Sequence, residues 1–235
     1  MCIRDRFDPT VAPLVELWGF GKDKDAEEPS VAAVDSALRL VGIDSCYLTA
    51  DRRVVKKSPA TTFNFSAIAK GYGCDLMGKM FRRNGVNDFM VEIGGEILVS
   101  GVSARGSKWR VMIDAPIPSN DSVIHDGMAV IEIDSCGVAT SGNYRNYKKI
   151  KNFTVGHSIS PVTGQPVQTD LLSVTIVAPE CITADAFATA CMLLPLDSAK
   201  AVIERCDGVS ALFVTASDSG QWVLTPTTGF PDIRY

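Results

Sequence analysis

The chain is poor in several features that define common classes of protein. Its 235 residues contain only two histidines, His125 and His157, which argues against a polyhistidine metal centre. None of the seven cysteines belongs to a Cys-x-x-Cys pair, so we expect mostly small buried thiols, no zinc site and at most one disulfide. The net charge of −4, without a long basic run, argues against a nucleic-acid surface.

Long apolar runs are also missing. No stretch approaches the roughly 20 residues that a membrane span needs. The first six residues, MCIRDR, are charged and have no apolar core, so we expect no secretory signal in them, and Cys2 lacks the apolar run that precedes a lipid-attachment cysteine. With 46% hydrophobic and 21% charged residues, the composition suits a globular core in one domain or two close lobes.

The pattern of apolar residues and turn signals predicts more strands than helices. We expect helices over 30–40, 66–83, 183–194 and 197–206. We expect strands over 45–50, 53–57, 88–93, 96–101, 108–114, 128–134, 153–159, 171–178, 210–215 and 221–225. Because these strands come in hairpin-like pairs, the pattern favours an α+β fold with mainly antiparallel sheets and packed helices over a doubly wound parallel sheet.

An aspartate and a threonine lie four residues apart in the run ITADAFATA. Asp185 and Thr189 would share one face of a helix, where a carboxylate and a hydroxyl can offer two oxygens to a hard cation such as Mg²⁺. The alanines around them leave room for a bulky ligand. The alternative is structural: an acidic residue in a first turn complements the helix dipole, and a threonine inside a helix bonds back to a carbonyl.

A second run, NFSAIAKGYG, places small residues and Lys70 at an expected helix start. Backbone N–H groups at such a start, together with the lysine charge, can bind a phosphate. The alternative is that Ser66 simply caps the helix and that the Lys70 side chain is solvated. In the run VEIGGEI, the glycine pair indicates a turn or bulge between two strands, and only weakly a ligand site.

Two further runs carry candidate binding groups. Trp18 and Phe20 flank Gly19 at the end of an apolar helix, where they could stack on a flat ring or simply form an apolar helix end with a glycine cap. His157 ends an expected strand and enters a turn marked by Pro161 and Gly164. That position suits a proton acceptor or, equally, a structural histidine.

Seven runs, in this order, resemble the FAD:protein FMN transferase family, the ApbE family of flavin transferases. They are FDPTVAPLVELWGFG, SAIAKGYGCD, EIGGEI, ATSGNYRNY, HSISPVTGQPV, LLSVTIVA and ITADAFATA. The resemblance covers Phe7 to about Leu224 and is specific because of the order and spacing. It implies an ApbE-like, two-lobed single domain over 7–235, with residues 1–6 unmatched and the family's N-terminal portion, including its A-M-G-T-like stretch, absent.

The resemblance also implies an enzyme, its substrate and its site. Such enzymes bind FAD and a divalent cation, usually Mg²⁺, and transfer the FMN half of FAD to a serine or threonine hydroxyl of a target protein, releasing AMP. By similarity, the metal ligands are the side chains of Asp185 and Thr189 and the backbone carbonyl of Ala67. The catalytic residues are His157 and Asp185, and the positions that contact FAD are Trp18, Gly19, Phe20, Asn64, Lys70 and Ile159.

Family members generally work outside the cytoplasmic membrane, often lipid-anchored in the periplasm, on flavin-carrying subunits of membrane redox complexes. We therefore expect a periplasmic or membrane-anchored setting, although this chain shows no export signal. Two positions depart from the family pattern, since Asn64 and Ser160 stand where aspartate is common. Two other functions stay open: an FAD pyrophosphatase that gives FMN and AMP, and a non-catalytic FAD-binding remnant.

Overall fold

The computed structural model describes residues 7–21, 28–117, 126–142, 147–150, 153–156 and 158–235, with the backbone alone described in 147–150 and 153–156. These residues form two compact units. Unit 1 is built from residues 1–65 and 146–168, and unit 2 from residues 66–145 and 169–235. Within the described ranges, no helix has both the length and the apolar character needed to cross a membrane.

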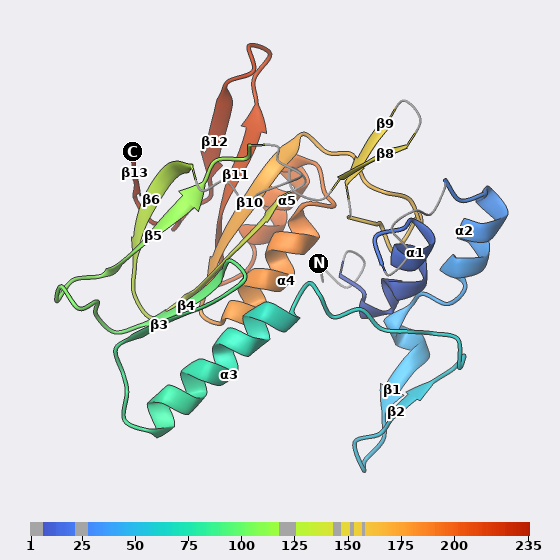
Figure 1. Ribbon diagram of the computed structural model, residues 1–235, viewed down its shortest axis with the longest axis horizontal. Coiled ribbons are helices and arrows are strands. Elements are labelled where there is room, and N and C mark those ends of the chain that lie inside the picture. The colour runs from blue at the N-terminus through green and yellow to red at the C-terminus, as the bar shows by residue number, and fades with distance from the viewer. Residues whose placement is uncertain (1–6, 22–27, 118–125, 143–146, 151–152, 157) are drawn as a thin grey trace. The chain divides into compact units, whose positions relative to one another are not determined.

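Unit 2 is a six-stranded sheet with helices on one face and a second, three-stranded sheet on the other (Figure 1). Its elements are, in chain order, α3 Ala69–Arg83, β3 Phe89–Ile93, β4 Glu96–Ser100, β5 Trp109–Asp114, β6 Gly127–Ile133, β7 Gly137–Gly142, β10 Leu171–Ala178, α4 Cys181–Cys191, α5 Leu196–Ile203, β11 Ser210–Ala216, β12 Trp222–Pro226 and β13 Ile233–Arg234. The strand orders are β12-β11-β10-β7-β4-β3 and β13-β6-β5.

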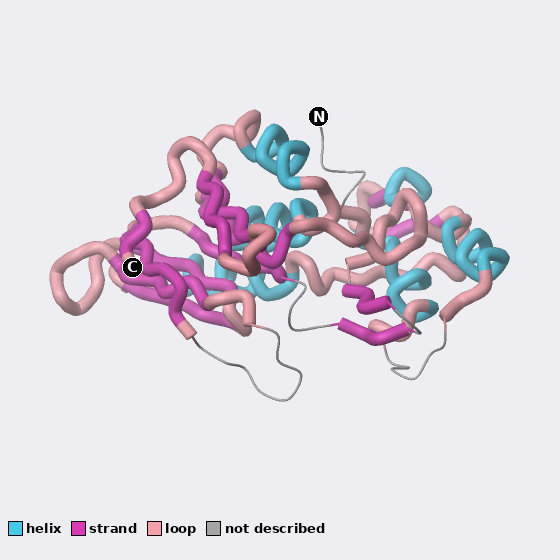
Figure 2. The backbone as a smooth tube through the Cα atoms, turned by 90° about the horizontal axis from the view of Figure 1, so that it is seen from above, coloured by secondary structure: helices cyan, strands magenta, loops and turns pink. Residues whose placement is uncertain are grey.

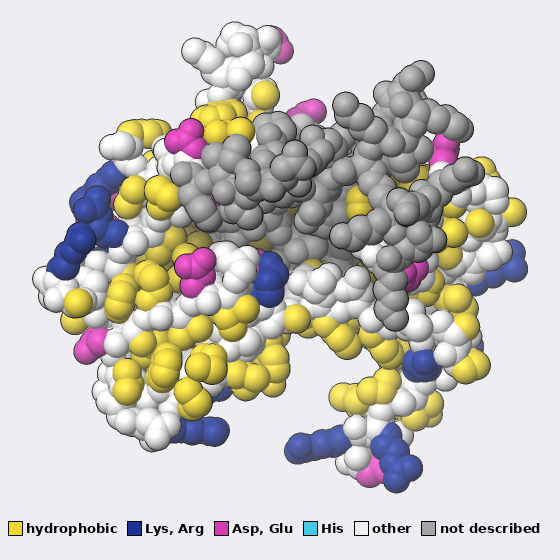
Figure 3. All heavy atoms as spheres, in the orientation of Figure 1, with side chains coloured by type: hydrophobic (Ala, Val, Ile, Leu, Met, Phe, Trp, Pro, Cys, Tyr) yellow, Lys and Arg dark blue, Asp and Glu magenta, His cyan; other side chains and the backbone are white. Residues whose placement is uncertain are grey.

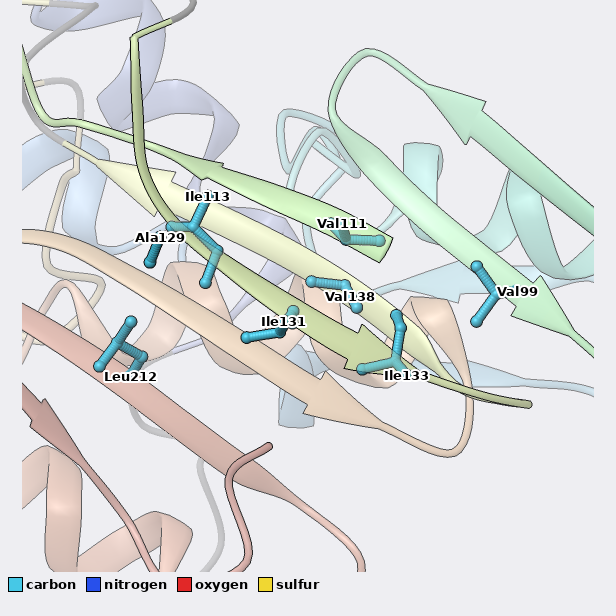
Figure 4. Close-up of a cluster of buried hydrophobic side chains, with 8 residues drawn as sticks. All are labelled: Val99, Val111, Ile113, Ala129, Ile131, Ile133, Val138 and Leu212. Atoms are coloured by element: carbon cyan, nitrogen blue, oxygen red, sulfur yellow. The ribbon is translucent and has the colours of Figure 1, made fainter. Parts of the chain in front are cut away.

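Alternation along the strands separates the two cores of unit 2. Leu98 packs with Cys74 of α3 and Cys181 of α4, whereas the next residue, Val99, packs on the other face with Ile131. Successive side chains of a strand point to opposite faces, so the large sheet is buried on both sides. Figure 4 shows the second core, in which side chains from both sheets face one another; it contains Val99, Val111, Ile113, Ala129, Ile131, Ile133, Val138 and Leu212.

The apolar run LLSVTIVA forms β10, near the centre of the large sheet. It pairs with β11 on one side and with β7 on the other, and most of its residues are buried. A continuous apolar run of this length is typical of a strand covered on both faces. The outer side of α3 differs: Tyr72, Leu76 and Met80, four residues apart, are exposed, and hydrophobic side chains gather over this helix in Figure 3.

Unit 1 contains short helices and two hairpins, whose strands are magenta in Figure 2. Its elements are the 3₁₀ helix η2 Pro9–Val11, α1 Ala12–Leu17, α2 Val31–Leu38, the 3₁₀ helix η3 Ile43–Ser45, β1 Cys46–Leu48, β2 Val54–Lys56, β8 Tyr147–Ile150 and β9 Phe153–Gly156. Its core contains Leu14, Trp18, Val34 and Ile159. Asp8 caps η2 through Thr10 and also accepts from the Ile43 amide at 2.9 Å.

Every pairing between described strands is antiparallel, so the predicted α+β fold is confirmed. The helix expected from residue 66 begins at Ala69, and the strand expected over 153–159 ends at Gly156. The sequence did not predict β7, β8 or β13. β7 reads GVATSG, whose small and polar residues have little intrinsic strand signal. It is a strand because β4 and β10 pair with it on either side.

Candidate active site

A buried aspartate joins α4 to α3 at the centre of the candidate site. Asp185 is only 2% exposed, and its Oδ2 accepts a hydrogen bond from the backbone N–H of Gly71, at 3.0 Å. Because α4 begins at Cys181, Asp185 lies in the second turn rather than the first. The simple interpretation of this residue as a surface complement to the helix dipole therefore does not fit. Asp185 instead faces the junction of two helices.

Glycine allows α3 and α4 to approach closely enough for that hydrogen bond. A Cβ atom on Gly71 would lie 2.7 Å from the carbonyl carbon of Cys181 and 2.8 Å from the Cα of Ile182. Gly137 of β7 is constrained in the same way, since its Cβ would lie 2.9 Å from the Glu180 carbonyl carbon. The start of α4 is thus held between two glycine backbones, one from a helix and one from a strand.

Another aspartate, which lies on α3, caps α4. Asp75, 6% exposed, accepts the Cys181 N–H with Oδ1 and the Ile182 N–H with Oδ2, both at 2.9 Å. The residue preceding α4, Glu180, makes no capping bond with its own side chain. Sequence reasoning missed Asp75 because capping residues are normally sought just before a helix. A charged residue among the small and apolar residues of GYGCD was the available signal.

Thr189 follows Asp185 one turn later, as predicted. It is partly buried, and its Oγ1 lies 3.4 Å from the hydroxyl oxygen of Ser141 in β7. Ala67, the third predicted metal ligand, lies in the turn that precedes α3, within the same unit. All three residues belong to unit 2, and their assignment as metal ligands stays a prediction.

Lys70 pairs with a glutamate that the sequence analysis did not single out. Its Nζ forms a short ion pair with Oε1 of Glu96, whose side chain is 4% exposed, whereas the lysine side chain is 43% exposed. Glu96 follows the Gly94-Gly95 turn between β3 and β4, where both glycines have positive φ, so the predicted turn is confirmed. The signal for Glu96 was its position: a charged residue opening a strand that is otherwise almost wholly apolar.

The charges in this cluster are not balanced. Burial raises the pKa of the Glu96 carboxyl, the Lys70 ammonium opposes that shift, and the nearby Asp185 carboxylate adds to it. Burial also raises the pKa of Asp185, against the effects of the Gly71 N–H and of Lys70. Two buried carboxylates therefore share one half-exposed ammonium group. This arrangement favours the arrival of a further cation.

The start of α3 differs from the simple anion site that the sequence suggested. The helix begins at Ala69 without a side-chain cap, the Gly71 amide is already bonded to Asp185, and the Lys70 charge is paired with Glu96. The positive groups at this helix start therefore already have protein carboxylates as partners. A phosphate approaching here would meet Lys70 together with two carboxylates, which requires a cation to accompany it.

The donors present fit a magnesium ion better than a softer metal. Among the described residues, no three His, Cys, Asp or Glu side chains gather into a metal cluster. Mg²⁺ does not need such a cage, because it keeps several waters and is usually held by one or two carboxylates and by substrate phosphates. Asp185 offers a buried carboxylate and Thr189 a hydroxyl oxygen. The described cysteines, the alternative soft ligands, are all free thiols, and Cys74, Cys181 and Cys191 are buried.

The predicted flavin-contacting residues of unit 1 lie in or beside its core. Trp18 is 6% exposed and donates its indole Nε1–H to the Gly164 carbonyl, at 2.7 Å. Gly19 has φ 71° and follows the C-terminus of α1, as a glycine cap would. Ile159 packs in the same core as Trp18, and Phe20 packs against it, partly buried. The described geometry gives Trp18 a structural role, and flavin contact by this group stays a prediction.

Two other positions that the sequence analysis named, Asn64 and Ser160, lie in unit 1. The Asn64 backbone N–H donates to the Pro9 carbonyl at 2.6 Å, which ties the run before α3 to η2. Ser160, where the family often has aspartate, accepts the amides of Val162 and Thr163, each at 3.2 Å, and so closes the turn. His157, the predicted proton acceptor, lies outside the described residues.

Comparison with known proteins identifies the family to which this chain is similar. The model of the ApbE family matches residues 4–213. The FAD:protein FMN transferase of Salmonella typhimurium is 32% identical over 91% of this chain, and that of Vibrio cholerae 35% identical over 91%. This chain spans 61% and 62% of those two relatives.

A solved structure shares the fold. The apo form of the Pseudomonas stutzeri flavinyl transferase ApbE superposes with a TM-score of 0.81 at 34% identity, over 95% of this chain and 67% of that one. The family match covers most of the chain, and the structural match extends over both units. On this basis the chain belongs to the ApbE family.

Proposed function

We propose that this chain is a divalent-cation-dependent transferase that moves the FMN moiety of FAD onto a serine or threonine hydroxyl of a target protein and releases AMP. The observation that carries the proposal is the buried Asp185, held against α3 by the Gly71 amide with Thr189 one turn away. Family membership and the names of the relatives, FAD:protein FMN transferase, support the same reaction.

The reaction is an attack on a diphosphate. The oxygen of the target hydroxyl forms a bond to the phosphorus of the FMN half, the bond from that phosphorus to the bridging oxygen breaks, and AMP leaves with that oxygen. The hydroxyl proton must be accepted by a base. Such a transfer depends on positioning and on neutralising phosphate charge rather than on unusual side-chain chemistry.

Several residues would divide this work. Asp185, Thr189 and the Ala67 carbonyl would hold a Mg²⁺ ion, which when bound would offset the charge of the diphosphate. Lys70 brings a second positive charge, and its pairing with Glu96 restricts where its Nζ can lie. Asp75 and Gly71 fix the start of α4 and so the orientation of Asp185. We assign the base to His157, by resemblance to the family.

The partner and the setting follow from the same resemblance. We propose that the target is a flavin-carrying subunit of a membrane redox complex and that the reaction takes place in the periplasm or at its membrane face. The relatives are named FAD:protein FMN transferases, which supports a protein as the acceptor.

The proposal is tested by incubating the purified chain with FAD, Mg²⁺ and a target protein that contains an acceptor threonine. Flavin fluorescence on the denatured target and AMP in the same tube are the expected products. Asp185→Ala should abolish both, whereas Asp207→Ala, which removes an exposed aspartate beyond α5, should leave both unchanged.

Other outcomes would assign another function. AMP without flavin on the target would indicate an FAD pyrophosphatase, and FAD binding without AMP would indicate a carrier. Mg²⁺-dependent turnover retained in Asp185→Ala would refute the role of Asp185.

A further inference from the structure

One oxygen of the buried Glu96 carboxylate has no partner. Glu96 is 3% exposed; its Oε1 is taken by Lys70, and its Oε2 forms no hydrogen bond. Two other buried side-chain atoms in the described part of the chain are also unpartnered, but both are hydroxyls, on Thr169 and Ser173. An unsatisfied atom on a buried charged group is costlier than one on a hydroxyl, so its presence calls for a ligand.

The surroundings of Glu96 show what kind of ligand is missing. The Asp185 carboxylate, 2% exposed, lies close enough to act on the Glu96 charge, and Lys70 is the cation that acts on both. Two negative charges against one positive charge leave a net negative charge in a buried place. The ligand that satisfies Oε2 should therefore donate hydrogen bonds and bring positive charge.

The turn at Gly94 lies beside this pair. A Cβ atom on Gly94 would lie 3.2 Å from Cδ of Lys70 and 4.0 Å from Oε2 of Glu96. Because Gly94 has no side chain, the lysine stem can pass over the turn. The backbone of Glu96 is fixed independently, since its carbonyl accepts the Cys74 thiol at 3.3 Å. The position of the carboxylate is thus built into the hairpin and does not depend on Lys70 alone.

We propose that Glu96 is a positioning residue for the cation: Oε2 accepts a hydrogen bond from a water bound to the divalent ion at Asp185 and Thr189, while Oε1 holds Lys70. This inference rests on the cation site of the proposed function. A water is the appropriate link because Mg²⁺ keeps several waters and because the described residues contain no cluster of three carboxylates that could bind the ion directly. Glu96 would then link the divalent ion, through its bound water, to the Lys70 ammonium group.

The test measures cation binding without FAD and without turnover. Mn²⁺ serves as the probe, and electron paramagnetic resonance counts the free ion. Glu96→Gln should weaken Mn²⁺ binding about 10–100-fold, the range usual for partners that orient metal-bound groups. Glu92→Gln, an exposed glutamate on β3, is the matched control and should change the affinity less than about twofold.

Lys70→Met separates a role toward the cation from a merely structural ion pair. If Glu96 served only to pair with Lys70, removing the ammonium would weaken Mn²⁺ binding as much as Glu96→Gln does. Under the proposal, Lys70→Met leaves both oxygens of Glu96 available and removes a competing positive charge, so Mn²⁺ should bind at least as tightly as to the parent protein. A loss of affinity in this variant would overturn the proposal even if Glu96→Gln failed to fold.

Asp185→Asn distinguishes the failure of this inference from the failure of the proposed function. Unchanged Mn²⁺ binding in Asp185→Asn would show that the cation site itself is wrong. Lost binding in Asp185→Asn, together with normal binding in Glu96→Gln, would refute the role of Glu96 alone. Lost binding in the first and weakened binding in the second supports both.

Discussion

Gly71 offers the sharpest test of how the site is built. Replacing it with alanine places a Cβ 2.8 Å from the Ile182 Cα, where ordinary van der Waals contact begins at 3.4 Å. The atoms in the way belong to the backbone of α4, which cannot rotate aside as a side chain can. Either α3 and α4 separate by about half an ångström or more, or α3 bends, and both changes lengthen the hydrogen bond from Gly71 N–H to Asp185.

The cost can be bounded. Overpacking a close contact costs about 1–3 kcal/mol, and alanine regains up to about 1 kcal/mol through its higher helix propensity. Because the contacts are with backbone atoms, the upper part of the overpacking range applies, about 2–3 kcal/mol, so the net loss in the free energy of unfolding should be about 1–2 kcal/mol. In a domain of this size that corresponds to a fall of about 2–8 °C in Tm, measured by calorimetry. Mn²⁺ affinity should fall in the same variant.

Gly73→Ala is the matched control on the same helix. Its Cβ would meet only the Cδ1 of Ile93, at 2.9 Å, which is the end of a flexible side chain. Helix propensity should therefore dominate, and this variant should be as stable as the parent or more stable by up to about 1 kcal/mol. Equal Tm values and equal Mn²⁺ affinities for the two alanine variants would show that close packing at Gly71 does not position Asp185.

Three further changes test other parts of the structure. Asp75→Ala leaves two amides of α4 without their cap and should cost about 2 kcal/mol or more in urea unfolding. Trp18→Phe leaves the Gly164 carbonyl unpaired and should cost about 1–2 kcal/mol in the same assay. Burial raises the Glu96 pKa above its ordinary 4.5, so the folded protein binds a proton at this carboxyl at a higher pH than the unfolded chain does. The parent protein should therefore gain stability relative to Glu96→Gln as the pH falls from about 7.5 to about 5. The measurement is made with a chelator present, so that no divalent cation is bound.

Each of these has a result that contradicts it. Asp207→Ala, an exposed aspartate, sets the baseline for Asp75→Ala, and equal unfolding midpoints would exclude a capping role. Trp18→Phe with an unchanged midpoint would mean that the indole N–H contributes nothing. A stability difference between the parent protein and Glu96→Gln that stays constant across this pH range would mean that Glu96 titrates normally in the folded chain.

The sequence predicted most of the architecture because its signals are local. The antiparallel hairpins, the glycine turn before Glu96 and the i, i+4 spacing of Asp185 and Thr189 can all be seen within short windows. The missed features depend on residues far apart in the chain. Asp75 caps a helix that begins 106 residues later, and Glu96 pairs with a lysine 26 residues earlier, so no short window contains either contact.

β7 was missed for a related reason. Its small and polar residues become a strand only because two neighbouring strands supply the hydrogen bonds. The surroundings of a side chain were also hard to predict. The sequence favoured an apolar helix end for Trp18 over stacking on a ligand, but it could not identify Gly164 as the partner of the indole N–H. The sequence predicted the chemical type of each group, but it could not predict which partner that group contacts.

The contact between Trp18 and Gly164 has a consequence for how the protein is made. These residues are 146 positions apart, so the first segment of unit 1 cannot bury Trp18 against its partner until the later segment has been synthesised. At roughly 5–20 residues per second, the ribosome takes roughly 7–30 s to cover that distance. Leu14 and Trp18, both buried in the finished protein, stay without this part of their core throughout that interval. We expect this core of unit 1 to be completed only late in translation, after the turn that contains Gly164 has left the ribosome.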